Sequence, residues 1–432
     1  MSFSLPNNPH FRLYCTLHLS KYSSNPASYN FDIIQLTTSG AMDSDRDHRE
    51  QLLRVLDPNR PPKVPPRFWS PPTDPDRPSL PYMPGFKAQI QSHVAPFPFG
   101  DGELYGPWPR RQLSYDELKT VTQSALVVAH PPLEATRTPS DTETPSETAQ
   151  LTITSHISVG CGAGAQVVVC TVAKPGKPPF EAVAKIYDAL YYRFSHSIAS
   201  RPRDVTAEAD KDYAAEAAAY KQLTSVGRAS KVTPAYYGSW TFSLPILSKG
   251  VQQMRPVRLV LIEHLQGSNL RGLHIQNSAQ IHDGPDSFHL PEEYRLEILA
   301  HAMDAYVQVL HCGVEQNDFA SRNIIISSKD TSTDTDTTGT SIPRVALTDY
   351  NTAIVYSLTR YGRSIEESLA LPVNPMQCFW KQAVAGDFLG WVPREWEGSP
   401  KPMQEWLLQR FGSEEQRALY EPVSKELEFY EE

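Results

Sequence analysis

Proline is the feature that most limits how this chain can fold. The chain has 38 prolines in 432 residues, and the densest run lies between residues 58 and 84. Proline fixes its own φ angle and has no backbone N–H to donate, so it interrupts both helices and sheet ladders. We therefore expect residues 1–110 to be extended or largely disordered, and the folded part of the chain to come later.

One short helix is predicted between this proline-rich arm and the main domain. Ser114 and Glu117 have the spacing of a capping box, and apolar residues follow at helical intervals, so a flanking helix is expected within residues 111–131. The next segment, 132–148, is rich in Thr, Ser, Pro and Glu and is predicted to be a polar linker.

From residue 149 the sequence alternates between short β-type runs and helical patterns. Residues 149–266 are expected to contain five strands and one helix, in the order strand, strand, strand, helix, strand, strand. Residues 267–432 are mostly of helical character, with one apolar stripe from Leu296 to Leu310. A Ser/Thr/Asp-rich insert at 327–342 is expected to be disordered.

The overall composition excludes several classes of protein. The net charge of -9 argues against binding to nucleic acids or anionic membranes, because proteins bind such partners chiefly through Lys and Arg. The five cysteines are an odd number without a Cys-x-x-Cys pair, so neither a disulfide framework nor a zinc site is indicated. No apolar run reaches the roughly 18 to 20 residues of a membrane span. We expect a cytoplasmic protein with reduced thiols.

Asp318 and Asn323 are the first candidate site residues. They lie five positions apart on a predicted loop, directly before the apolar run Ile324 to Ile326. A carboxylate at such a place can act as a base, and an amide oxygen can bind a metal. Asp and Asn are also common turn residues, so this pair by itself is weak evidence.

Four further elements strengthen the case. Gly160, Gly162 and Gly164 lie at a predicted turn, where the backbone could approach phosphates. Lys185 lies in the apolar strand Ala182 to Ile186, where a buried ammonium needs an anionic partner. Glu216 on the next helix could reach that lysine, and Asp349 at the end of a later strand offers a second carboxylate placed to hold Mg²⁺.

In this order the elements resemble the protein-kinase-like superfamily, and most closely the divergent fungal kinase-like proteins that share features with aminoglycoside and choline phosphotransferases. The resemblance implies an α+β, two-lobed protein-kinase-like fold, with a small antiparallel β-sheet lobe at 149–266 and a helical lobe at 267–432. It implies ATP and Mg²⁺ as cofactors and a hydroxyl-bearing acceptor.

The resemblance also implies a role for each candidate residue. The catalytic residues would be Asp318 as the base, Lys185 on the α and β phosphates, and Glu216 as the partner of that lysine. The metal ligands would be Asn323 and Asp349. The nucleotide would lie against a third set of residues: Gly160, Gly162, Gly164, Val167, Lys185, Glu263 and Leu265.

Two departures from the family pattern leave alternatives open. Gln316-Asn317 precedes Asp318 where most protein kinases have His-Arg, and Tyr350-Asn351 follows Asp349 where they have Phe-Gly. A protein Ser/Thr acceptor is favoured, with a small-molecule acceptor as one alternative. The other is a pseudokinase that binds nucleotide or partners without catalysis, in which the proline-rich arm would dock partner domains.

Each candidate residue also has a plainer interpretation. Lys185 could be an edge lysine that discourages strand pairing, and Glu216 could be a solvated helix residue. The glycines could mark only a hairpin turn.

Overall fold

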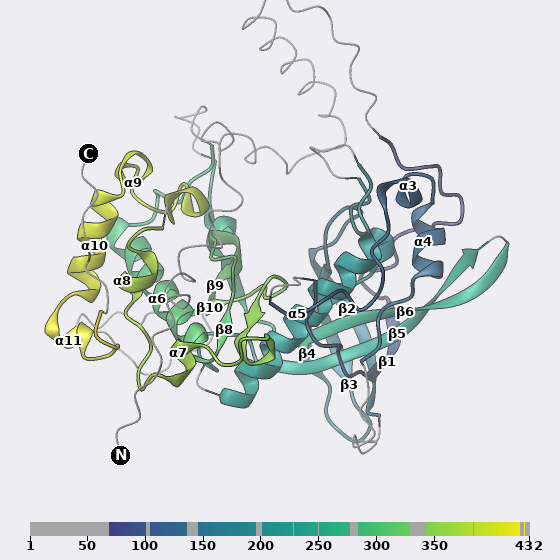
Figure 1. The fold of residues 1–432 in the computed structure, drawn as a ribbon, viewed down its shortest axis with the longest axis horizontal. Coiled ribbons are helices and arrows are strands. Elements are labelled where there is room, and N and C mark those ends of the chain that lie inside the picture. Colours follow the sequence, from purple (N-terminus) through teal and green to yellow (C-terminus); the bar gives the residue numbers. More distant parts are fainter. Residues whose placement is uncertain are drawn as a thin grey trace, which may run out of the picture. The chain divides into compact units, whose positions relative to one another are not determined.

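The structure, a computed structural model, describes most of the chain from residue 69 onward (Figure 1). The described residues are 69–100, 104–135, 146–195, 201–227, 229–248, 250–276, 284–327, 343–382, 384–423 and 427. The proline-rich run before residue 69, the middle of the expected linker and all but the first residue of the expected insert at 327–342 lie outside them.

Six antiparallel strands close into a barrel. The order of neighbouring strands is β1, β2, β3, β4, β6 and β5, with β5 pairing back onto β1. Their bounds are Lys87–Ser92 for β1, Thr148–Ser158 for β2, Gln166–Ala173 for β3, Phe180–Tyr187 for β4, Tyr236–Ser248 for β5 and Val251–Ile262 for β6.

Strand β1 is what closes the barrel. Its residue Lys87 pairs with Thr152 of β2, and Gln91 pairs with Thr241 of β5, so both edges of β1 are occupied. Ile90 is fully buried in the barrel core. Since β1 belongs to the segment 1–110, residues 87–92 of that segment are an ordered part of the barrel and not part of a disordered extension.

The barrel core follows from the period-2 alternation of its strands. In β4, Ala182, Ala184 and Ile186 belong to the core inside the barrel, whereas Val183 and Tyr187 belong to a second core outside it. Successive side chains of a strand point to opposite faces, which explains how one apolar run serves two cores.

The second core contains the long helix α5 (Val205–Val226) and helix α6 (Glu292–His311). Asp204 caps the N-terminus of α5 by accepting a hydrogen bond from the Ala207 N–H at 3.1 Å. Gly227 ends the helix at φ 73°, in the left-handed region where glycine avoids a side-chain clash. Helix α5 packs against β4, β5 and β6, so it lies on the outer face of the barrel (Figure 1).

Two small sheets follow the barrel. One has the strand order β10, β9, β7 and the other pairs β11 with β8. The bounds are Gly267–Asn269 for β7, Val314–Glu315 for β8, Ile324–Ser327 for β9, Arg344–Leu347 for β10 and Ile354–Val355 for β11. Because β9 and β10 are antiparallel, the chain entering β9 and the chain leaving β10 lie at the same end of the sheet.

The remaining described helices are short. They are α3 (Tyr115–Leu118), α4 (Gln123–Ala129), α7 (Ile365–Ser368), α8 (Pro375–Phe379), α9 (Glu395–Gly398), α10 (Lys401–Phe411) and α11 (Glu414–Arg417). Single turns of 3₁₀-helix are η4 (Ala189–Tyr191), η5 (Leu270–Leu273), η6 (Ser321–Asn323), η7 (Tyr356–Leu358) and η8 (Val384–Phe388). The capping box at Ser114 and Glu117 is present, but the flanking helix forms as two pieces, α3 and α4.

The two-lobed protein-kinase-like fold predicted from the sequence is wrong. Its small open sheet is instead a closed six-stranded antiparallel barrel, and the helical content is modest. Residues 69–432 form one unit of structure. The physical reason is β1: the prediction started the folded domain at residue 149, and so it omitted the strand that removes both sheet edges. None of the helices in the described ranges is both long enough and apolar enough to cross a membrane.

Candidate functional site

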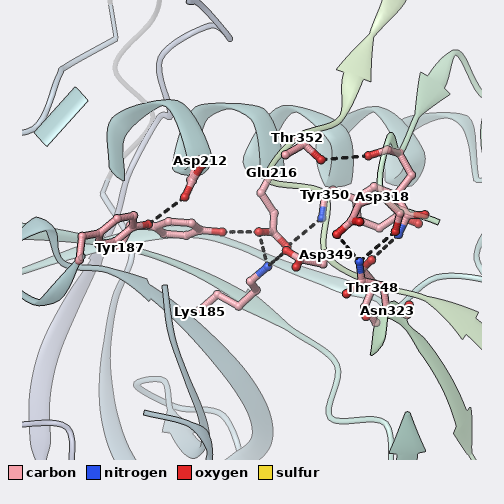
Figure 2. A network of polar contacts seen from close by, with 12 residues as sticks. Lys185, Tyr187, Asp212, Glu216, Asp318, Asn323, Thr348, Asp349, Tyr350 and Thr352 are labelled. Carbon is pink, nitrogen blue, oxygen red and sulfur yellow. Dashed lines mark hydrogen bonds and ion pairs between the residues drawn. The ribbon is translucent and has the colours of Figure 1, made fainter. Parts of the chain in front are cut away.

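A buried lysine between two carboxylates forms the centre of the candidate site (Figure 2). The Lys185 Nζ donates a hydrogen bond to Asp349 Oδ1 at 2.7 Å and makes a closer ion pair with Glu216 Oε2. Lys185 comes from β4, Glu216 from α5 and Asp349 from the residues that follow β10. The predicted contact between Lys185 and Glu216 is therefore present, and Asp349 joins it.

The period of β4 explains why Lys185 faces α5. Val183 and Tyr187 lie two residues to either side of Lys185 and pack in the core outside the barrel, so Lys185 points to that same face. Its side chain is 10% exposed and that of Glu216 is fully buried, whereas the Asp349 side chain is 36% exposed. Asp349 is thus the residue of this cluster that solvent or a ligand can reach.

The three charges shift one another's pKa values. Burial opposes ionisation of all three groups and is the largest effect on each. Burial raises the pKa of Glu216 above its ordinary value despite the nearby Lys185. For Asp349 burial is exceeded only by the sum of the Lys185 charge, the Lys185 hydrogen bond and the Arg322 charge, so the pKa of Asp349 is lowered. The two carboxylates together raise the pKa of Lys185. A charged lysine beside an ionised Asp349 is the resulting state at neutral pH.

Glu216 has two further donors besides the lysine. The Tyr187 hydroxyl donates to Glu216 Oε2 at 2.5 Å, and the Tyr350 N–H donates to Oε1 at 3.4 Å. A fully buried carboxylate needs such partners, because leaving it unpaired is costly. Glu216 is therefore fixed in place by groups from β4 and from the loop that contains Asp349.

Two residues of the site have left-handed backbone conformations. Asn317 has φ 63° and Asp349 has φ 64°; among the described residues they alone, apart from glycines, have positive φ. Asn and Asp tolerate this region better than other side chains, but it still costs energy, and such residues concentrate at functional sites. The strain occurs on both loops that carry the predicted catalytic and metal residues.

Asp318 and Asn323 contact each other across the loop. The Asn323 Nδ2 donates to Asp318 Oδ2 at 2.7 Å and to the Asp318 carbonyl oxygen at 2.9 Å. Arg322 donates to Asp318 Oδ1 at 2.5 Å. Both carboxylate oxygens of the predicted base therefore have donors, which orient the carboxylate.

The loop with Asp318 lies beside the loop with Asp349. The Thr348 N–H and hydroxyl both donate to the Asn323 carbonyl oxygen, at 2.9 and 3.1 Å. Figure 2 shows Asp349 between the Lys185 and Glu216 side chains on one side and the Asp318 and Asn323 side chains on the other. The structure thus brings together the three predicted catalytic residues and both predicted metal ligands.

The residues present suit a magnesium ion of the kind that is shared with a nucleotide. Within the described ranges no group of three or more His, Cys, Asp or Glu side chains is arranged to hold a metal. Mg²⁺ bound with nucleotides usually takes only one or two protein ligands, with phosphate oxygens and waters completing the shell. Asp349, with its partly exposed carboxylate, and the amide oxygen of Asn323 meet that smaller requirement.

The loop with Gly160, Gly162 and Gly164 has open space around it, but two of its backbone N–H groups already donate hydrogen bonds within the protein. The Gly160 N–H donates to Gln166 Oε1 at 2.7 Å, and the Gly162 N–H donates to the Tyr191 carbonyl at 2.8 Å. A side chain added at Gly160 or Gly164 would meet nothing within 4 Å. Val167 pairs with Lys185 across β3 and β4, so this predicted nucleotide contact lies next to the lysine.

Glu263 and Leu265 are not brought to the lysine by any contact of the described residues. Arg344 binds both oxygens of Glu263, at 2.8 and 3.1 Å, and the Glu263 backbone N–H donates to the Ala235 carbonyl. Leu265 is buried. The two-lobed fold that implied a nucleotide contact for these residues is not the fold observed, and their contact with a nucleotide stays a prediction.

Sequence reasoning missed three residues of the site. Tyr187 bonds Glu216, and its signal was its position two residues after Lys185 on the same strand face. Arg322 bonds Asp318. The buried Gln316 donates to the Thr348 carbonyl at 2.5 Å, which ties the two loops together. Gln316 appeared in the sequence only as a departure from a motif.

A partly open cavity lies elsewhere. It has a volume of about 470 Å³ between α6 and the α10–α11 region, with Asp304, Arg410 and Tyr420 among its lining residues. None of the predicted site residues lines it. The candidate site is instead the cluster around Lys185, because that cluster unites charged residues from four separate segments.

Comparison with known proteins adds no family assignment. No model of a known protein family matches the chain, and no curated protein matches it.

Proposed function

We propose that this chain is an ATP- and Mg²⁺-dependent phosphotransferase that transfers the γ-phosphate to a hydroxyl acceptor. The observation that carries the proposal is Lys185 held between Glu216 and Asp349, beside the paired Asp318 and Asn323. The ordered motifs that resemble protein-kinase-like phosphotransferases support the same chemistry. The fold is no part of the support.

Each side chain has a role in the proposed reaction. The Lys185 ammonium neutralises phosphate charge, and Glu216 keeps that ammonium in position. Asp318 accepts the proton of the acceptor hydroxyl, while Asn323 and Arg322 orient its carboxylate. Asp349 and Asn323 supply oxygens suited to Mg²⁺. When bound, this ion would neutralise the negative charge of the phosphates.

We favour a Ser or Thr hydroxyl of a protein as the acceptor, with a small amino alcohol as the alternative. The cytoplasm is the proposed compartment, since ATP is abundant there and two cysteines of the described residues, Cys161 and Cys170, are free thiols.

Nucleotide binding without transfer is a second candidate. The observation that favours it is the state of Asp318, whose two oxygens already accept hydrogen bonds from Arg322 and Asn323. Each oxygen can accept a further hydrogen bond, but an acceptor hydroxyl must share the carboxylate with these two donors. If no acceptor reaches it, the site would bind nucleotide and serve as a scaffold.

The first test is binding. We expect Mg²⁺-ATP to raise the melting temperature of the wild-type chain and ATP with a chelator to raise it less, since a ligand at 100 times its Kd adds about 2.7 kcal/mol to the stability. Asp349→Asn keeps a residue that tolerates the left-handed backbone, and it should remove the effect of the metal. A wild-type chain that shows no shift at millimolar Mg²⁺-ATP contradicts the proposal.

The second test is transfer of labelled γ-phosphate to casein or to amino alcohols. Asp318→Asn should lower transfer by roughly 10² to 10⁴-fold while Mg²⁺-ATP binding persists. Asp387→Asn is the matched control, because Asp387 is an exposed aspartate of η8 whose carboxylate lies 3.9 Å from the same Arg322. Binding without transfer in the wild type favours the scaffold instead.

A further inference from the structure

A short segment between strands β1 and β2 contacts the chain just after Asp349. The Val355 N–H donates to the Tyr105 hydroxyl at 2.7 Å, and that hydroxyl donates to the Ala353 carbonyl at 3.4 Å. The Arg360 N–H donates to the Leu104 carbonyl at 2.9 Å. Residues 104 and 105 are therefore bound to the backbone on both sides of strand β11.

Strand β11 is connected to both loops of the site. It pairs with β8, where Ile354 lies opposite Glu315 and Val355 opposite Val314. Strand β8 leads directly into the loop with Asp318, and β11 begins five residues after Asp349. A side chain that holds β11 in place therefore also fixes the end of each loop that is attached to β8 or β11.

The same segment binds helix α5 five residues later. Arg110 makes an ion pair with Asp210 Oδ2 at 3.2 Å and donates to the Thr206 hydroxyl at 2.9 Å. The Asp210 side chain is 4% exposed and that of Arg110 19%, so this ion pair is largely shielded from water. Asp210 and Thr206 lie in the first turns of the helix that carries Glu216.

The stretch between these two anchors is stiff. Its sequence is Gly106-Pro107-Trp108-Pro109, and each proline fixes its own φ. The Trp108 ring packs edge-on against Phe99, with ring centres 5.3 Å apart. A stiff connection of four residues allows little change in the distance between its ends.

We propose that residues 104–110 form a strap that sets the spacing between α5 and the Asp349 loop, with Tyr105 and Arg110 as positioning residues. Glu216 and Asp349 approach Lys185 from those two elements, so the strap controls whether both carboxylates reach the lysine together. This inference rests on the proposed function for its consequence for catalysis, but the mechanical coupling it describes can be measured without any nucleotide.

Neighbouring arginines provide a matched pair of variants. Arg110 binds α5, whereas Arg111 binds Glu117 within its own segment. We expect Arg110→Gln to speed amide hydrogen exchange at least tenfold in residues 349–360, which Arg110 does not contact. Arg111→Gln should leave exchange there unchanged. If Arg110→Gln speeds exchange only in the first turns of α5, the role of Arg110 is local and the strap is wrong.

The reverse experiment tests the other end. Tyr105→Phe removes only the hydroxyl that binds Ala353 and Val355, and we expect it to speed exchange in residues 205–216 of α5. Coupling between two sites is reciprocal, so both directions must be seen. Tyr115→Phe, at an exposed tyrosine of α3, is the control. An effect of Tyr105→Phe confined to residues 353–360 overturns the proposal even if Arg110→Gln fails to fold.

Nucleotide binding then separates the two proposals. We expect Arg110→Gln and Tyr105→Phe to weaken Mg²⁺-ATP binding by about five- to tenfold, which corresponds to about 1 kcal/mol. Arg111→Gln should bind Mg²⁺-ATP as tightly as the wild type does. If the variants show the exchange effects but the wild type binds no ATP, the strap stands and the phosphotransferase assignment fails. If ATP binds equally to all of them, the strap does not position the site.

Discussion

At the scale of single residues, the pKa of Asp212 predicts a measurable dependence of stability on pH. Asp212 lies one turn before Glu216 on α5 and accepts a hydrogen bond from the Tyr192 hydroxyl at 3.2 Å (Figure 2). Burial is the largest effect and raises the pKa of Asp212 to about 7, against the lowering by Tyr192. An aspartate in an unfolded chain has a pKa of about 4. Between about pH 4 and pH 7 the folded chain therefore binds more protons than the unfolded chain, so its stability falls as pH rises.

We expect Asp212→Asn to remove this contribution. The free energy of unfolding of the wild type, relative to that of Asp212→Asn, should fall by about 1 kcal/mol or more between pH 4 and pH 7 and then level off. Urea unfolding across this pH range measures it. A difference that is flat, or that grows with pH, would show that Asp212 is ionised in the folded protein throughout.

At the scale of elements, strand β7 depends on a glycine. Gly267 pairs with Ser327 of β9, and a side-chain carbon added at Gly267 would lie 1.8 Å from the Ile326 carbonyl oxygen. The backbone of β9 would have to move to admit it. Since β9 directly follows Asn323, we expect Gly267→Ala to lower stability by about 2 kcal/mol or more and to weaken Mg²⁺-ATP binding as well.

Gly398→Ala is the control for this element. A side chain added at Gly398, the last residue of α9, meets nothing within 4 Å. It should change the free energy of unfolding by less than about 1 kcal/mol. Equal costs at the two glycines in thermal unfolding would show that the close approach at Gly267 is relieved without moving β9.

At the scale of the whole molecule, the barrel depends on β1. Ile90 is fully buried in the barrel core, whereas Gln89, its neighbour on the opposite strand face, is exposed. We expect Ile90→Ala to cost about 2 to 4 kcal/mol, because it removes buried surface and leaves a cavity. Gln89→Ala should cost less than about 0.5 kcal/mol. Chemical denaturation of both variants measures the difference, and equal stabilities would mean that β1 is not part of the cooperative core.

The sequence by itself determined the local elements and the charged residues of the site. Helix α5 and the strands β2 to β6 follow from composition and periodicity, which act over a few residues. The need of Lys185 for an anionic partner followed from its apolar strand, and Glu216 was its candidate partner. These inferences succeeded because each depends on neighbouring residues or on a simple rule about buried charge.

Only the tertiary structure decided how the chain closes and what supports the site. Strand β1 is separated from its partner β2 by more than fifty residues, and no local pattern in a proline-rich segment shows which edges it will fill. Tyr105 and Val355 are 250 positions apart, and Gln316 meets Thr348 across 32. Such contacts arise when distant segments are packed together, so their partners depend on the whole fold and cannot be obtained from residues read in order.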